Sequence, residues 1–165
     1  MNPLTEQQIR ASLVNATKRE ITQASIPDLA AVRWDRLDYL GWVDVKRPLA
    51  AYVVIELDRG LTGMMLRAPG TAGRRARAMC AWCQDVTATD DVTLYVARRA
   101  GAEGRQGNTV GTLICTHFEC SRNARRMPSA TEVGSNDPAA RQLVVDRRIA
   151  SVQKRSRRFV EQLFQ

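Results

Sequence analysis

The four cysteines of this chain constrain its fold most strongly, because all of them occur in two close pairs. Cys80 and Cys83 lie in AMCAWCQD with two residues between them, and Cys115 and Cys120 lie in LICTHFECSR with four residues between them. The interval between the pairs is 31 residues. Disulfide bridges and a tetrahedral metal site both use cysteines in this way. The rest of the sequence favours the metal site.

The amino-terminal sequence bears on the redox environment of these thiols. MNPLTEQQIRASLV has no apolar run after basic residues, so it does not resemble a secretory signal peptide. No window approaches the roughly 18 apolar residues that a membrane-spanning helix needs. We therefore expect a cytoplasmic protein, in which thiols stay reduced. This location favours metal ligands over disulfides, although the spacing alone permits both.

The predicted metal is one structural Zn²⁺, bound by Cys80, Cys83, Cys115 and Cys120. A Cys-x2-Cys turn directs two thiolates at one ion, and four thiolates complete a tetrahedral shell. His117 lies inside the second pair and could replace one cysteine as ligand, but the four cysteines already complete the shell. A closed shell leaves no open position for a reactive water, and the sequence has no deaminase motif, Ser/His/Asp set or phosphate-binding loop. We therefore expect a binding protein and not an enzyme.

The chain before the cysteines predicts one long helix and a pair of strands. Thr5 and Gln8 have the spacing of a capping box, and the apolar pattern extends the helix from Glu6 to about Ala24, before Pro27. The segment WDRLDYLGW is either a short helical turn whose aromatics cover the core or a docking patch for a partner. AAYVVIELD and LTGMMLRA read as strands joined by a turn at DRG.

Two further strands and a helix are expected in the second half. The strands are predicted at Val92–Ala97 and Thr109–Ile114, joined by the glycine- and arginine-rich loop RRAGAEGRQGN. After the linker MPSATEVGSN, Asp137 and Pro138 have the residue types of a helix start. This helix combines an apolar stripe with an opposite basic side, and the basic residues are Arg147, Lys154, Arg155 and Arg158.

Together these elements predict an α+β fold, in which a small antiparallel sheet carries a treble-clef zinc finger and is flanked by N- and C-terminal helices. The order of a cysteine knuckle, a hairpin and then a helix that begins near the last cysteine is the order of a treble clef. We divide the chain into an N-terminal helical segment at 1–45, a β-rich region with the zinc finger at 46–135, and a C-terminal helix at 136–165 that packs on the same domain.

The net charge of +8 is concentrated in the half that holds the cysteines. Residues 1–70 carry a net charge of +1, and residues 71–165 carry +7. Such a field favours an acidic protein surface or a phosphate backbone as partner. Part of it is also expected to offset the negative charge of the zinc thiolates. The arginines nearest to the cysteines in sequence are Arg74, Arg75, Arg77, Arg122, Arg125 and Arg126.

Two longer runs of sequence resemble a known family. GRRARAMCAWC and ARRAGAEGRQGNTVGTLICTHFECS are similar to the elongation factor G-binding family, which includes the FusB-type fusidic acid resistance proteins. LTEQQIRASLVNATKRE and WDRLDYLGW also resemble actinobacterial members. The resemblance implies a C-terminal treble clef with Cys80, Cys83, Cys115 and Cys120 as zinc ligands. It further implies binding to elongation factor G and release of that factor from the ribosome when fusidic acid has trapped it.

A second interpretation is a zinc protein that binds RNA or the ribosome directly, through basic loop residues and the basic face of the last helix. The glycine- and arginine-rich loop is equally well explained as a hairpin connection. If it contacts a partner, the residues we expect there are Arg98, Arg99, Arg105 and Asn108. No small-molecule substrate and no membrane association are expected.

Overall fold

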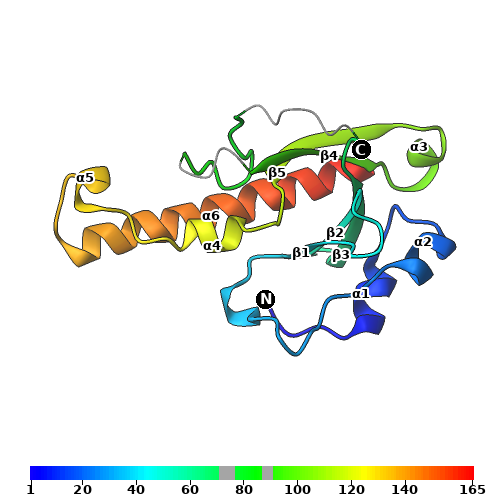
Figure 1. Cartoon of the computed structure of the whole chain (residues 1–165), viewed down its shortest axis with the longest axis horizontal. Coiled ribbons are helices and arrows are strands. Elements are labelled where there is room, and N and C mark those ends of the chain that lie inside the picture. The colour runs from blue at the N-terminus through cyan, green and yellow to red at the C-terminus, as the bar shows by residue number, and fades with distance from the viewer. Residues whose placement is uncertain (71–76, 87–90) are drawn as a thin grey trace.

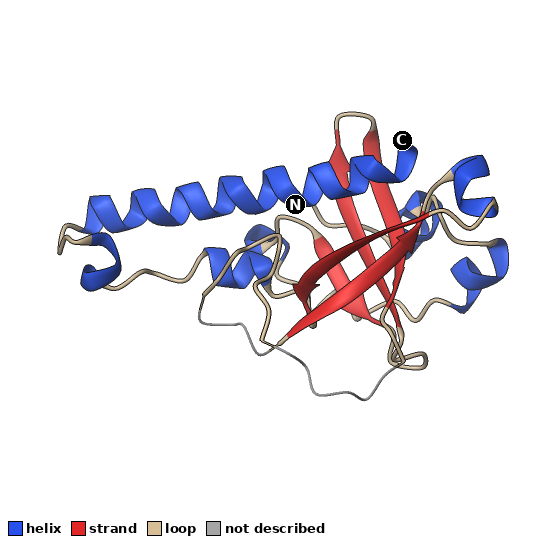
Figure 2. Ribbon diagram, turned by 90° about the horizontal axis from the view of Figure 1, so that it is seen from above, coloured by secondary structure: helices blue, strands red, loops and turns tan. Residues whose placement is uncertain are grey.

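A computed structural model describes residues 1–70, 77–86 and 91–165, and a five-stranded antiparallel sheet organises them (Figures 1 and 2). The strands follow one another in the sheet in the order of the sequence. Between β3 and β4 a single residue pair is in register, Arg67 with Val96, so the last two strands form a hairpin of their own. The predicted α+β class is confirmed. The strands are β1 (Leu40–Val43), β2 (Ala50–Leu57), β3 (Gly60–Arg67), β4 (Val92–Arg98) and β5 (Thr109–Cys115).

The N-terminal segment forms two short helices, so the expected single helix is wrong. α1 covers Glu6–Ser12 and α2 covers Lys18–Gln23. Thr17 begins the second helix with its own capping box, in which the Glu20 side chain accepts from the Thr17 backbone N–H at 2.8 Å. The Asn15 side chain accepts from the Met65 N–H and donates to the Met65 carbonyl, which fixes the break against β3. The sequence TKRE repeats the spacing of the first cap and is the feature that would have indicated the second helix.

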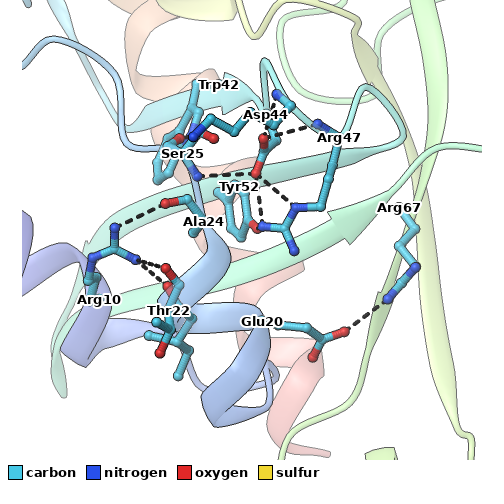
Figure 3. A network of polar contacts seen from close by, with 12 residues as sticks. Arg10, Glu20, Thr22, Ala24, Ser25, Trp42, Asp44, Arg47, Tyr52 and Arg67 are labelled. Carbon is cyan, nitrogen blue, oxygen red and sulfur yellow. Dashed lines mark hydrogen bonds and ion pairs between the residues drawn. The ribbon is translucent and has the colours of Figure 1, made fainter.

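A polar network fastens the chain after α2 to the turn between β1 and β2 (Figure 3). The carboxylate of Asp44 is fully buried; it accepts hydrogen bonds from three backbone N–H groups and pairs with Arg47 at 2.9 Å. Trp42 donates its indole N–H to the Ser25 carbonyl at 2.8 Å. Hydrogen bonds of this kind hold a segment without regular secondary structure in one position.

All of the remaining helices except the short turn Trp34–Arg36 belong to the cysteine-bearing half of the chain. Helix α3 (Gly101–Arg105) interrupts the loop between β4 and β5, and helix α5 (Ala130–Val133) interrupts the expected linker. The long helix begins as predicted, with the side chain of Asp137 accepting from Ala139 N and Pro138 in the first turn. It extends well past the sheet toward α5 (Figure 1). The bounds are η1 (Trp34–Arg36), α3 (Gly101–Arg105), α4 (Cys120–Ala124), α5 (Ala130–Val133), α6 (Pro138–Glu161) and η2 (Gln162–Phe164).

Strand β2 is buried on both faces, which explains its continuous run of apolar residues. Tyr52 and Val54 pack with the N-terminal segment, whereas Ala51, Val53 and Ile55 pack with the cysteine-bearing half and α6. Successive side chains of a strand point to opposite faces. The β1–β3 part of the sheet therefore separates two apolar clusters, and the buried cysteines belong to the cluster on one of its faces.

No helix among the described residues combines the length and the apolar composition that crossing a membrane requires.

Candidate metal centre

Three separate elements bring the four cysteines together as the sequence predicts. Cys80 and Cys83 form the knuckle, Cys115 is the last residue of β5, and Cys120 is the first residue of α4. Their sulfur atoms all lie within 4.8 Å of one another. The sequence of knuckle, β4–β5 hairpin and short helix is the treble-clef arrangement that the spacing predicts.

The sulfur positions fit a tetrahedral zinc ion. With zinc–sulfur bonds of about 2.3 Å, the edges of the tetrahedron are about 3.8 Å long. The Cys80–Cys120 sulfurs are 3.5 Å apart and the Cys83–Cys115 sulfurs 3.6 Å apart. Both distances greatly exceed the roughly 2.05 Å of a disulfide bond, and all four cysteines are free thiols. The site therefore has the geometry of one structural Zn²⁺.

Both ligand-bearing turns contain a residue in the left-handed backbone region. Gln84 follows the knuckle at φ 52°, and Phe118 lies between the other two cysteines at φ 59°. This conformation costs a residue with a side chain about 1–2 kcal/mol. The backbone N–H of Gln84 donates to the Cys80 carbonyl, and that of Phe118 to the Cys115 carbonyl, each at 2.9 Å. The turns are thus held tightly enough to direct their cysteines inward.

Three N–H groups lie within hydrogen-bonding reach of the sulfurs. The backbone N–H groups of Trp82 and Cys83 point to Cys80 Sγ at 3.4 and 3.5 Å. From α4, the Asn123 amide nitrogen lies 3.5 Å from Cys115 Sγ and 3.9 Å from Cys83 Sγ. Donors around a thiolate lower its charge density and fix its orientation toward a metal. Asn123 was not predicted from the sequence, but it lies one helical turn after Cys120, where a helix returns to the same face.

The thiols affect one another's acidity because they are so close. Hydrogen bonding with Cys115 lowers the pKa of Cys80 far below the usual thiol value. Hydrogen bonding with Cys115 also raises the pKa of Cys120 far above it. Protons are therefore shared unequally within the cluster, and a divalent cation is what allows all four sulfurs to be thiolates together.

The only histidine lies outside the cluster. The His117 side chain is 67% exposed and faces Asp91, with its Nε2 atom 3.9 Å from the carboxylate. The structure therefore agrees with a ligand set made of cysteines alone.

The arginines that were expected to offset the thiolate charge mostly pair with carboxylates instead. Arg122 pairs with Glu119 at 2.7 Å, and Arg126 approaches Asp85 at 3.7 Å. Arg125 pairs at 2.6 Å with Asp38, whose carboxylate is nearly inaccessible. Arg77 is exposed, whereas Arg74 and Arg75 lie outside the described residues. The N–H donors therefore give a better account of the sulfur environment than the arginines do.

Aromatic side chains connect the knuckle to the core. Trp82 is 1% exposed and packs edge-on against Tyr39, with ring centroids 4.9 Å apart. Its ring also contacts Phe159 of α6 at 5.9 Å, and its carbonyl accepts from Arg155 at 3.1 Å. Burial raises the pKa of Tyr39 well above its usual value, and the nearby thiolates add to that effect. The cysteine knuckle, α6 and the sheet are thus parts of one packed unit.

The four residues predicted to contact a partner gather near α3, but three of them already have partners within the chain. Arg98 pairs with Glu20 at 2.6 Å, Arg99 donates to the Gln162 and Gln165 carbonyls, and Asn108 donates to Glu103. Arg105 is exposed and has no such partner among the described residues. The three arginines line one cavity of about 250 Å³, together with Val14, Asn15, Ala16, Thr17, Gly101 and Gly104.

Comparisons with known proteins agree with this geometry. A family model described as FBP C-terminal treble-clef zinc-finger matches residues 8–163. Searches of curated proteins and of solved structures find no match. The matched range includes both cysteine pairs, the whole sheet and all of α6.

Proposed function

The chain belongs to the FBP C-terminal treble-clef zinc-finger family, and we propose that it is a zinc-stabilised binding protein whose partner is elongation factor G. The observation that carries the proposal is the family match together with four sulfurs within 4.8 Å of one another. The two long runs that resemble elongation factor G-binding proteins support the choice of partner. Since that factor works in the cytoplasm, the proposal implies a cytoplasmic protein.

The proposed activity is binding without covalent chemistry. Four thiolates fill the coordination shell of zinc, so the ion has no position left for a substrate or a reactive water. Binding energy instead changes the populations of the partner's conformations. On this basis we extend the proposal to release of elongation factor G from the ribosome, including release of a factor trapped by fusidic acid.

The proposed contact surface is the arginine-lined cavity beside α3. Of the predicted contact residues, Arg105 is the only one whose side chain has no hydrogen bond or ion pair among the described residues. Arg98, Arg99 and Asn108 then act mainly by holding the cavity in shape. A guanidinium that is free and exposed is well suited to a carboxylate on a partner.

Binding of the zinc-loaded protein to purified elongation factor G at physiological salt tests the proposal. We expect a saturable complex in calorimetry, and Arg105→Glu should weaken it by about tenfold or more, since reversing one charge at an interface costs more than about 1.4 kcal/mol. Arg33→Glu makes the same charge change at another exposed site and should have little effect. The absence of any complex would remove the proposed function, whereas equal effects of the two variants would remove only the proposed contact surface.

A further inference from the structure

The long helix α6 holds most of the net positive charge of the protein. Its 24 residues include seven Lys and Arg and two Asp and Glu, a net charge of +5, whereas the whole chain carries +8. Its apolar side is used in the fold, with Val145, Val152, Phe159 and Val160 buried. The charge is therefore concentrated on the side that faces solvent.

Four of the seven basic residues have structural contacts. Arg141 donates to the Pro128 carbonyl at 2.8 Å, and Arg155 donates to the Trp82 carbonyl at 3.1 Å. Arg148 pairs with Glu132 at 3.2 Å and Arg157 with Asp58 at 3.1 Å. The other three are exposed and have no hydrogen bond or ion pair within the part of the chain that the structure describes; they are Arg147, Lys154 and Arg158.

These three residues form a straight row, which we call the basic row. At 100° per residue, positions 147, 154 and 158 lie within about 40° of one another around the helix. Along the axis they are separated by about 10 Å and about 6 Å. A shallow depression of about 510 Å³ adjoins the row, and Lys154, Arg157, Arg158, Glu161, Gln162 and Gln165 line it. Glu161 has the single acidic side chain among these lining residues.

We propose that the basic row of α6 binds the phosphate backbone of double-helical RNA. Long cationic side chains that lack partners and project in a row suit a regular line of phosphates. An acidic protein surface fits less well, because protein interfaces depend on buried apolar and aromatic anchors. Leu143 is the only large apolar residue exposed on α6, and it lies at the end farther from Lys154 and Arg158.

The surroundings of the row favour a duplex over a single strand. Proteins that bind single strands stack bases on exposed aromatic side chains. The only aromatic residue of α6 is Phe159, which is buried. Phe164, just after α6, is partly exposed, but the Arg59 guanidinium lies over its ring, 4.1 Å from the centroid. The row therefore contacts phosphates without reading bases.

The packing of α6 favours RNA over DNA. A helix that reads B-form DNA must project from its protein far enough for its exposed side chains to reach base edges in the major groove. α6 is fixed along its opposite side by the apolar cluster and by contacts with α4 and α5. An A-form duplex presents a wide, shallow minor groove and its phosphates to a surface that cannot enter a groove. A helix exposed on one side suits that shape.

Fluorescence anisotropy with a labelled 20-base-pair RNA duplex, measured from about 50 to 200 mM salt, tests the inference. The test variant is Arg147→Gln/Lys154→Gln/Arg158→Gln in the zinc-loaded full chain. We expect at least about tenfold weaker binding at 100 mM salt, and a slope of log affinity against log salt that is shallower by about 2–3. The matched control is Lys18→Gln/Arg19→Gln/Arg33→Gln, which removes the same charge from exposed positions in the N-terminal segment. It should leave both quantities nearly unchanged.

Several outcomes would overturn the inference. No binding by the unaltered protein, or equal losses in both triple variants, would mean that the row is not an RNA site. Equal affinity for a DNA duplex of the same length, or for polyglutamate, would show a general anion surface. Zinc content and melting temperature, checked in every variant, show that each one is folded. The experiment contains no elongation factor G, so its failure leaves the proposed function untouched.

Discussion

Gly41 of β1 lies directly against the ring of Phe118, which is in the turn between Cys115 and Cys120. A Cβ atom at Gly41 would be 2.6 Å from Phe118 Cγ, closer than carbon atoms approach without displacement. The ring cannot move freely, because it packs on Tyr95 with centroids 5.2 Å apart and its backbone is at φ 59°. Because Gly41 has no side chain, the strand leaves room for the Phe118 ring and so helps to set the conformation of the turn between Cys115 and Cys120.

Gly41→Ala is expected to lower stability by about 1–3 kcal/mol, the usual cost of overpacking a rigid contact. It should also speed the loss of zinc to a chelator, because Phe118 and its turn must shift. Gly111→Ala on β5 is the control, since its new Cβ atom would be 3.5 Å from its nearest neighbour, an ordinary contact. Thermal unfolding and zinc-release kinetics measure both effects. Similar values for the two variants would show that the Gly41–Phe118 contact is not tight.

Asn123→Ala is expected to weaken zinc binding by about 10–100-fold with little change of fold, because it removes the amide donor from Cys115 and Cys83. Asn123→Asp should weaken binding more, since it has nearly the same shape but directs a negative charge at thiolates. Arg122→Ala, on the exposed side of α4, is the control. Competition with a chromogenic chelator gives the affinities. If Asn123→Asp binds zinc as tightly as the unaltered protein, the amide is not a donor to sulfur.

The cysteine cluster was predictable from sequence because two close pairs, with no cysteine left over, supply the four ligands of one tetrahedral site. The strands and α6 were predictable for a similar reason, since their apolar periods and the Asp137–Pro138 start are local features. The break between α1 and α2 was not predicted, although the Thr17–Glu20 capping box is a local sign of it. The hydrogen bonds that fix the break join Asn15 to Met65, 50 residues away. Likewise, the sequence identified the arginines near the cysteines but not their carboxylate partners, of which Asp38 and Asp85 come from distant segments. The division at residues 45 and 135 stays a prediction.

Removal of zinc is expected to unfold at least the knuckle and α4. A four-cysteine site contributes roughly 10–16 kcal/mol in finger peptides, as much as the whole stability of an ordinary domain. Trp82 should then become exposed, which shifts its fluorescence to longer wavelength. Because metal binding releases thiol protons, the chelator concentration that removes half of the zinc should fall as pH falls.

Two substitutions test whether Trp82 is the source of that fluorescence change. Trp82→Phe should abolish most of it, and it forfeits no hydrogen bond because no acceptor lies near the indole nitrogen among the described residues. Trp42→Phe should preserve the change, although it removes a hydrogen bond to Ser25 and lowers stability by about 1 kcal/mol. A spectrum that does not respond to chelation would contradict the coupling between the ion and the core.

Glu20 is expected to make stability depend on pH in the acid range. Burial of its carboxyl group raises the pKa, but hydrogen bonds from Thr17 and the pairing with Arg98 outweigh this and lower the pKa to about 2, from an ordinary value of 4.5. The unfolded chain therefore binds the proton more tightly than the folded chain. The stabilisation is fully present above pH 4.5 and is lost as pH falls toward 2.

The measurement is the difference in unfolding free energy between the unaltered protein and Glu20→Gln. We expect a difference of about 1–3 kcal/mol at pH 6, from the lost ion pairs and the weakened cap. The difference should shrink as pH falls from 4.5, because protonated Glu20 resembles glutamine. Zinc loss in acid affects both proteins alike, so it cancels in the difference. Glu6→Gln, at a 59% exposed carboxylate paired with Arg10, should give a small difference throughout. If the difference in unfolding free energy between the unaltered protein and Glu20→Gln stays constant down to pH 3, Glu20 is not the group that titrates.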